Sequence, residues 1–120
     1  MVLVDTSVWV AHLRKGNAKL EVLLNEGTVV CHPFIIAELA CGTMRNRMQI
    51  LSLLQSLPMA ETAEHSEVLQ FIEHNRLAGK GLGYVDVHLL TSAVLTSVPL
   101  WTLDRKLQQA SSKLRIDYKL

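Results

Sequence analysis

Short apolar stretches alternate with longer amphipathic ones along this chain. Three stretches predict buried strands: 2–4 (VLV), 27–32 (GTVVCH) and 99–104 (PLWTLD). Elsewhere, apolar residues recur at helical spacing and predict helices over 7–15, 18–26, 33–42, 46–56, 66–79, 81–97 and 105–114. Short strands that alternate with helices are typical of an α/β protein whose parallel sheet is covered on both faces.

Two acidic residues stand at the carboxyl ends of predicted strands. Asp5 directly follows the first strand, and Asp104 directly follows the apolar part of the last strand-like stretch, in LWTLD. Because parallel strands end at the same edge of a sheet, we expect both carboxylates at the edge where α/β proteins bind ligands. Each aspartate also precedes a predicted helix, so an N-cap role is an equally good interpretation of either one taken alone.

Two further acids, Glu38 and Asp86, fall inside apolar helical stretches. The residues three and four positions away are apolar or small: Phe34, Ile35, Cys41 and Gly42 for Glu38, and Leu82, Gly83, Leu89 and Leu90 for Asp86. A carboxylate removed from water costs several kcal/mol unless it is paired or bound to a cation. Most lysines and arginines lie on polar stretches, so we expect both acids to be buried and to serve a cation site.

Four converging carboxylates would repel one another by about 4 kcal/mol per close pair at an effective dielectric constant near 20. A divalent cation would remove that repulsion. Ligands that are all oxygen, without histidine or cysteine, favour Mg²⁺ or Mn²⁺ over zinc. Such a site is typical of enzymes that cleave phosphodiesters, because the metal activates water for attack.

Composition narrows the class of protein. A chain of 120 residues predicts one domain spanning 1–120. No apolar run is long enough for a membrane helix or a signal peptide, and we expect a cytoplasmic protein. Cys31 and Cys41 are not at metal-ligand spacing and are expected to be small buried hydrophobes. The net charge is only +1, so binding of nucleic acid would depend on local clusters of positive charge.

The motifs VDTSVW, HPFIIAELACG, GLGYVDVHLL and LWTLDRKL occur in the order and spacing of a PIN domain. The chain resembles the VapC-type ribonuclease toxins of bacterial toxin–antitoxin pairs over essentially its whole length. Carried over from that resemblance, the acidic metal site falls on Asp5, Glu38, Asp86 and Asp104. The hydroxyl groups that support it fall on Thr6 or Ser7, and on Thr102.

The resemblance implies a PIN-like α/β/α sandwich with a central, mainly parallel sheet. It also implies a Mg²⁺- or Mn²⁺-dependent endoribonuclease whose products carry 5′-phosphate and 3′-hydroxyl ends. The implied partners are RNA, a VapB-like antitoxin and a second copy of the chain. Candidate RNA contacts are Lys80 in the glycine loop 78–84, Arg45 and Arg105, each of which can also be read as ordinary surface.

Other classes of protein fit less well. A phosphatase of the haloacid-dehalogenase type needs an acid where Ser7 stands, and a receiver domain needs paired acids after its first strand and a lysine after a late one. A catalytically inactive PIN domain that only binds a partner is disfavoured by the complete set of acids. A PIN nuclease that processes RNA without being a toxin stays open, and so does the RNA that is cleaved.

Overall fold

The computed structural model describes residues 1–120 and contains three strands and seven helices. In chain order they are β1 Val2–Val4, α1 Thr6–Lys15, α2 Ala18–Asn25, β2 Val29–Val30, α3 Pro33–Cys41, α4 Arg47–Ser56, α5 His65–His74, α6 Tyr84–Thr96, β3 Leu100–Trp101 and α7 Arg105–Lys113. The predicted alternation of short strands and helices is therefore confirmed.

The three strands form one parallel sheet in the order β2-β1-β3. The central strand places Leu3 beside Val30 of β2 and beside Leu100 of β3. Successive side chains of a strand point to opposite faces, so Leu3 and Leu100 share one face, while Val4 and Trp101 share the other. With both faces buried, the strands need continuous apolar sequence, which is the pattern that the chain shows.

Single-residue bridges extend the sheet at both edges. Met59 pairs in parallel with Cys31 beyond β2, and Asp117 pairs in parallel with Leu100 beyond β3. The sequence analysis did not predict these two edge segments. Each segment pairs through one residue only, so its sequence is too short to show the apolar pattern of a strand.

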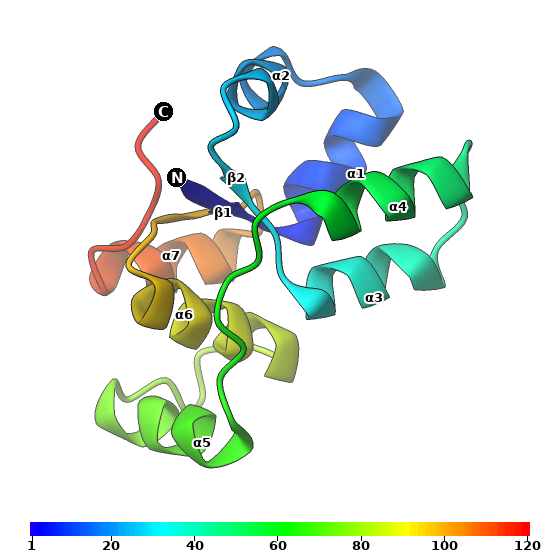
Figure 1. Cartoon of the computed structure of the whole chain (residues 1–120). Helices are drawn as coiled ribbons and strands as arrows, with labels where there is room; N and C mark the ends of the chain where they lie inside the picture. Colours follow the sequence, from blue (N-terminus) through cyan, green and yellow to red (C-terminus); the bar gives the residue numbers. More distant parts are fainter.

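Helices cover the sheet on both faces (Figure 1). With the edge segments included, the order is 59-β2-β1-β3-117, and right-handed crossover connections between these parallel segments place α1 to α4 on one face and α5 to α7 on the other. Figure 1 shows α1, α3 and α4 grouped together, away from α5, α6 and α7. The structure thus has the predicted α/β/α sandwich architecture.

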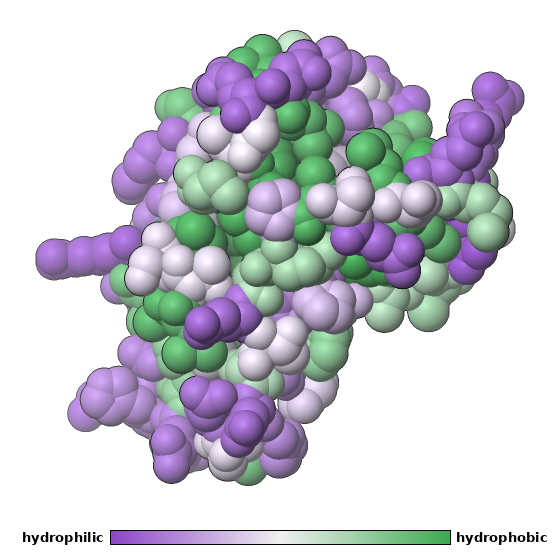
Figure 2. All heavy atoms as spheres, viewed as in Figure 1, coloured by the Kyte–Doolittle hydropathy of each residue, from purple (hydrophilic) through white to green (hydrophobic).

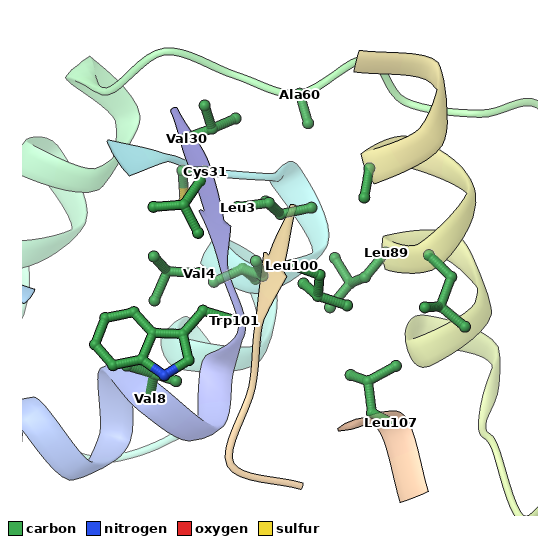
Figure 3. Packing of buried hydrophobic residues seen from close by; sticks show 14 of the residues in the cluster. Leu3, Val4, Val8, Val30, Cys31, Ala60, Leu89, Leu100, Trp101 and Leu107 are labelled. Carbon is green, nitrogen blue, oxygen red and sulfur yellow. The ribbon is translucent and has the colours of Figure 1, made fainter. Parts of the chain in front are cut away.

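The core is aliphatic and lies on both sides of β1 (Figure 3). Leu89 of α6 points toward Leu100 of β3, and Leu107 of α7 lies on the same side. All three side chains are fully buried. Burial of a leucine side chain contributes about 1.5–3 kcal/mol, so this packing fixes the ends of the strands that carry the site.

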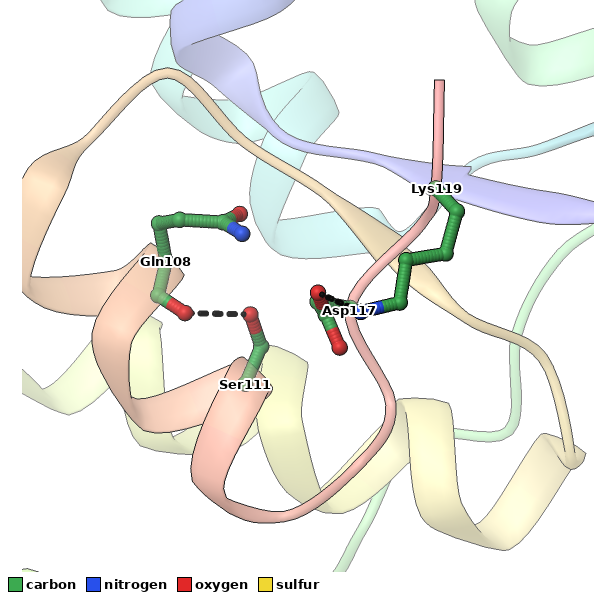
Figure 4. Close-up of polar contacts among 4 residues, drawn as sticks. All are labelled: Gln108, Ser111, Asp117 and Lys119. Atoms are coloured by element: carbon green, nitrogen blue, oxygen red, sulfur yellow. Dashed lines mark hydrogen bonds and ion pairs between the residues drawn. The ribbon is translucent and has the colours of Figure 1, made fainter.

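The C-terminal segment is held against α7 and the sheet edge (Figure 4). Tyr118 donates its backbone N–H to Leu100 O over 2.9 Å. Lys119 pairs with Asp117 at 3.0 Å, and this is the one ion pair of the structure. Within α7, Ser111 Oγ donates to the backbone carbonyl of Gln108.

Two expectations are corrected. The helix expected over 66–79 ends at His74, because Arg76 adopts a left-handed conformation (φ 54°) that stops the helix before Gly79. Cys31 is buried as expected, and burial raises the pKa of its thiol to about 11. Cys41 is exposed instead, because it lies at the end of α3 beyond the packed face.

No helix of the chain is long and apolar enough to cross a bilayer.

Candidate active site

Asp5 lies at the carboxyl end of β1 and is almost completely buried, with 6% of its surface exposed. Its Oδ2 accepts two hydroxyl hydrogen bonds, from Ser7 Oγ and from Thr102 Oγ1, both at 2.7 Å. Its backbone N–H donates to Trp101 O and ties it to β3. Asp5 is also the N-cap of α1, so capping and a place at the sheet edge are compatible roles.

Asp104 follows β3 at the same edge and is the N-cap of α7. Its Oδ1 accepts hydrogen bonds from the backbone N–H groups of Lys106 and Leu107, at 2.9 and 3.0 Å. Thr102 joins the two strand ends, because its Oγ1 donates to Asp5 and accepts from the Asp104 N–H. Asp104 itself is exposed, so its other carboxylate oxygen faces water.

Glu38 is exposed, and the expectation that it is buried on an apolar stripe is wrong. Of the small or apolar neighbours that suggested burial, Ile35 is buried, whereas Cys41 and Gly42 are exposed at the end of α3. Glu38 nevertheless belongs to the site region, because Thr6 Oγ1 donates to its Oε1 over 2.6 Å. The sequence left Thr6 and Ser7 as alternatives, whereas the structure uses Thr6 for Glu38 and Ser7 for Asp5.

Asp86 is half-buried in the first turn of α6. Its Oδ2 accepts the backbone N–H of Gly83 over 2.9 Å. Burial raises the pKa of the Asp86 carboxyl, and the negative charges of Asp104 and Asp5 raise it further, whereas the Gly83 hydrogen bond opposes this shift. Asp5 and Asp104 therefore lie close enough to Asp86 for their charges to disfavour its ionised form.

The four carboxylates share one arrangement. In each of them one oxygen is fixed by a hydrogen bond from the protein, and the second oxygen accepts none. None of them is paired with a lysine, an arginine or a histidine, since the single ion pair lies elsewhere. The acids are thus oriented, but their charge is not neutralised within the chain.

This arrangement suits a hard divalent cation. The available donors are carboxylate oxygens, the ligands that Mg²⁺ and Mn²⁺ prefer. No group of three or more acidic, histidine or cysteine side chains is close enough to form a complete metal cage. Mg²⁺ keeps several waters and is commonly bound through only one or two carboxylates, so the donors fit an open, hydrated site and not a closed one.

Clefts flank the acidic site and contain two of the three candidate RNA contacts. A groove of about 560 Å³ between α1 and the α3–α4 region includes Thr6, Glu38 and Arg45. Lys80 lines a separate cleft beside α7. Arg105 is exposed at the start of α7 and lines neither of them.

Two buried histidines beside the site are structural. His32 caps α3, because its Nδ1 accepts the Phe34 N–H over 3.0 Å while its Nε2 meets Ser92 Oγ at 3.0 Å. Burial, aided by the neighbouring His88, lowers the pKa of His32 to about 4. Burial also lowers the pKa of His88, whose ring lies 4.5 Å from the rings of Phe34 and Tyr84. Both histidines are therefore neutral near pH 7 and belong to the packing.

The family model described as PIN domain matches residues 2–113. The chain belongs to the PIN-domain family, as the α/β/α fold and the acidic sheet edge also indicate. It is 44% identical over 114 residues to ribonuclease VapC32 of Mycobacterium tuberculosis, strains CDC 1551 / Oshkosh and H37Rv, a match covering 94% of this chain and 92% of the relative. The resemblance to VapC-type ribonucleases is confirmed.

A solved structure shares the fold. The crystal structure of PAE2754 from Pyrobaculum aerophilum superposes with a TM-score of 0.64 and covers 91% of this chain and 78% of that one. The sequence identity is 21%, so the likeness concerns the fold alone.

Proposed function

We propose that the chain is a metal-dependent endoribonuclease and the toxin of a toxin–antitoxin pair. One observation carries the catalytic part: four oriented carboxylates have no cationic partner, and two of them, Asp5 and Asp104, follow neighbouring strands at the carboxyl edge of the sheet. The similarity to ribonuclease VapC32 supports RNA as the substrate. On this proposal Asp5, Glu38, Asp86 and Asp104 hold Mg²⁺ or Mn²⁺, directly or through water.

The bound cation would supply positive charge for the phosphodiester and lower the pKa of a nearby water. The protein's own groups orient the reactants. Ser7 and Thr102 fix the Asp5 carboxylate, and Thr6 fixes Glu38. The Oδ1 of Asp86 accepts no hydrogen bond from the protein, so it is free to accept one from the attacking water.

The proposed reaction is a hydrolysis. The water oxygen forms a bond to phosphorus, the bond from phosphorus to the 3′ oxygen breaks, and the leaving oxygen takes up a proton. The products then carry a 5′-phosphate and a 3′-hydroxyl.

The proposed biological setting is the cytoplasm, where cleavage of RNA inhibits translation until a VapB-like antitoxin binds. Apolar surface supports a partner and a homodimer. The exposed large apolar side chains include Met48 and Leu53 of α4 and Val94 and Leu95 of α6. Figure 2 shows hydrophobic patches between hydrophilic side chains on one face of the molecule.

The test uses purified protein freed of antitoxin. RNA should be cleaved with Mg²⁺ or Mn²⁺, cleavage should stop with excess EDTA, and the Asp5→Asn variant should be inactive. Cleavage that persists in excess chelator would overturn the metal site. Induced expression followed by mapping of new RNA 5′ ends identifies the target. A harmless induced protein with no antitoxin-like neighbour gene would favour an RNA-processing nuclease instead.

A further inference from the structure

A cleft of about 780 Å³ lies between the loop that follows α5 and one face of α7. It is lined by four cationic side chains and by no acidic one: Arg76, Lys80, Lys106 and Lys113. None of them takes part in the one ion pair of the chain. Since the whole chain carries a net charge of only +1, this concentration of unpaired positive charge is a local feature.

The cations occupy both walls of the cleft. Lys106 and Lys113 are seven residues apart on α7, which places them two turns apart on the same face. Gln109 lies between them and also lines the cleft. Arg76 and Lys80 belong to the opposite wall, formed by the loop that connects α5 to α6.

The side chain of Lys106 lies over a glycine of the opposite wall. The Lys106 side chain lies so close to the Gly81 backbone that a Cβ at position 81 would come within 2.7 Å of its Cδ and Nζ atoms. Gly81 also has a φ of +77°, which L side chains rarely adopt. Lys106 is therefore seated across the loop, and its backbone N–H donates to the Asp104 carboxylate.

Both walls of the cleft adjoin the acidic site along the chain. On one wall, Lys106 follows Asp104 by two residues and binds it through the backbone. On the other wall, the loop runs from Lys80 through Gly81 to Gly83, whose N–H binds Asp86.

We propose that this cleft binds the backbone phosphates of single-stranded RNA beside the scissile bond, an inference that rests on the proposed nuclease function. Phosphate contacts of this kind fix position and register without reading sequence. An acidic peptide is the weaker alternative, because the cleft offers few apolar side chains to bury: Leu77, Ala110 and Leu114. It is also weaker because Lys106 lies two residues from Asp104, which places one end of the cleft beside the acidic site.

Two arginines give a matched pair of variants. Arg76 and Arg115 each follow a helix in the left-handed conformation, with φ of 54° and 59°. The same hydrogen-bond pattern closes both turns, from Leu77 N to Ile72 O and from Ile116 N to Ser111 O. Glycine is the residue that this position favours, so Arg76→Gly and Arg115→Gly should both raise the melting temperature. Only Arg76 lines the cleft.

Binding is measured by the anisotropy of fluorescein-labelled oligo(U) in EDTA, over a series of KCl concentrations. Arg76→Gly should weaken binding and reduce the slope of log K against log salt by about 0.7, the loss of one phosphate contact. The double variant Lys106→Gln, Lys113→Gln should reduce the slope by about twice as much. Arg115→Gly and Lys19→Gln change residues outside the cleft, so they should leave the slope unchanged.

Unchanged slopes for Arg76→Gly and for the double lysine variant would overturn the proposal. So would competition by polyglutamate that equals competition by unlabelled oligo(U), because the cleft would then accept an acidic polypeptide. Binding in chelator does not depend on cleavage. The protein could fail to cleave RNA under any condition while its cleft variants still reduce the slope of log K against log salt. That result would overturn the proposed nuclease function and support the RNA-binding cleft.

Discussion

Thr102 Oγ1 donates to Asp5 Oδ2 over 2.7 Å, although 97 residues separate the two in the sequence. Their strands, β1 and β3, are neighbours in the sheet, so both residues emerge at the same edge. Both are at least 94% buried, since Asp5 is 6% exposed and Thr102 is 5% exposed. The contact therefore ties the orientation of the carboxylate to the pairing of the two strands.

Thr102→Val should damage both stability and catalysis. Valine has nearly the same shape but cannot donate to the carboxylate, and a hydrogen bond to a charged group contributes about 1.5–3 kcal/mol. We expect the free energy of unfolding in urea to fall by about that range. A misplaced Asp5 should lower the rate of cleavage about tenfold or more, since 1.4 kcal/mol of barrier corresponds to a factor of ten.

Thr102→Ser is the control for this substitution, because it keeps the hydroxyl group. It should retain most of the activity. If Thr102→Val cleaves RNA at the wild-type rate, the hydroxyl group of Thr102 does not position Asp5.

Glu38→Gln should abolish cleavage while leaving the fold intact. Glu38 is exposed, so its charge contributes little to packing, and the free energy of unfolding should change by less than about 0.5 kcal/mol. The rise in melting temperature that Mg²⁺ gives the wild type should shrink, because a ligand stabilises only the state that binds it. Glu21→Gln, an exposed change on α2, is the matched control. A large drop in melting temperature for Glu38→Gln would assign Glu38 a structural role.

Asp86→Asn should stabilise the protein when metal is absent. Burial and the charges of Asp104 and Asp5 disfavour the ionised Asp86 carboxylate, and the amide removes that charge while still accepting from Gly83. Because the site is partly hydrated, we expect a gain of up to about 1 kcal/mol in EDTA, measured by thermal melting. Glu73→Gln on the exposed face of α5 should show no such gain. A destabilised Asp86→Asn would contradict the repulsion.

Stability should fall as the pH falls from about 6.5 to 4, partly because of His32. The unfolded state takes up a proton on this histidine near pH 6.5, the folded state only near 4, so the unfolded state binds more protons in between. The contribution is at most about 3.5 kcal/mol, from about 2.5 pKa units at about 1.4 kcal/mol each. His32→Asn keeps a capping oxygen for α3 and removes this titration, so its urea unfolding should depend less on pH in that window. Equal pH dependence of both proteins would refute this assignment.

Most of the fold was predictable because both faces of the sheet are buried. The strand around Leu3 reads as an unbroken apolar run for that reason, and each following helix shows its own period. The end of α5 was not predictable in the same way. Gly79 appeared to be the stop signal, whereas the turn at Arg76 ends the helix with a residue that carries no such signal.

The site was predictable to the extent that it depends on strand ends. Asp5 and Asp104 follow strands, and the parallel sheet brings them to one edge. The burial of Glu38 was mispredicted, because spacing along a helix reports which residues share a face but not where the packed face ends. The cationic cleft was also missed: Lys106, Gln109 and Lys113 have the spacing of one helical face, but Arg76 joins them only through the tertiary fold.

The distance in sequence between the halves of the site has a consequence for synthesis. Asp5 is synthesised 97 residues before Thr102, and β1 has no β3 partner in that interval. At about 5–20 residues per second, this interval lasts about 5–20 s. Throughout it, the growing chain has an aspartate without its second hydroxyl partner and an incomplete set of acids. The acidic edge of the sheet is therefore completed only after residue 104 has emerged, however early Asp5 was made.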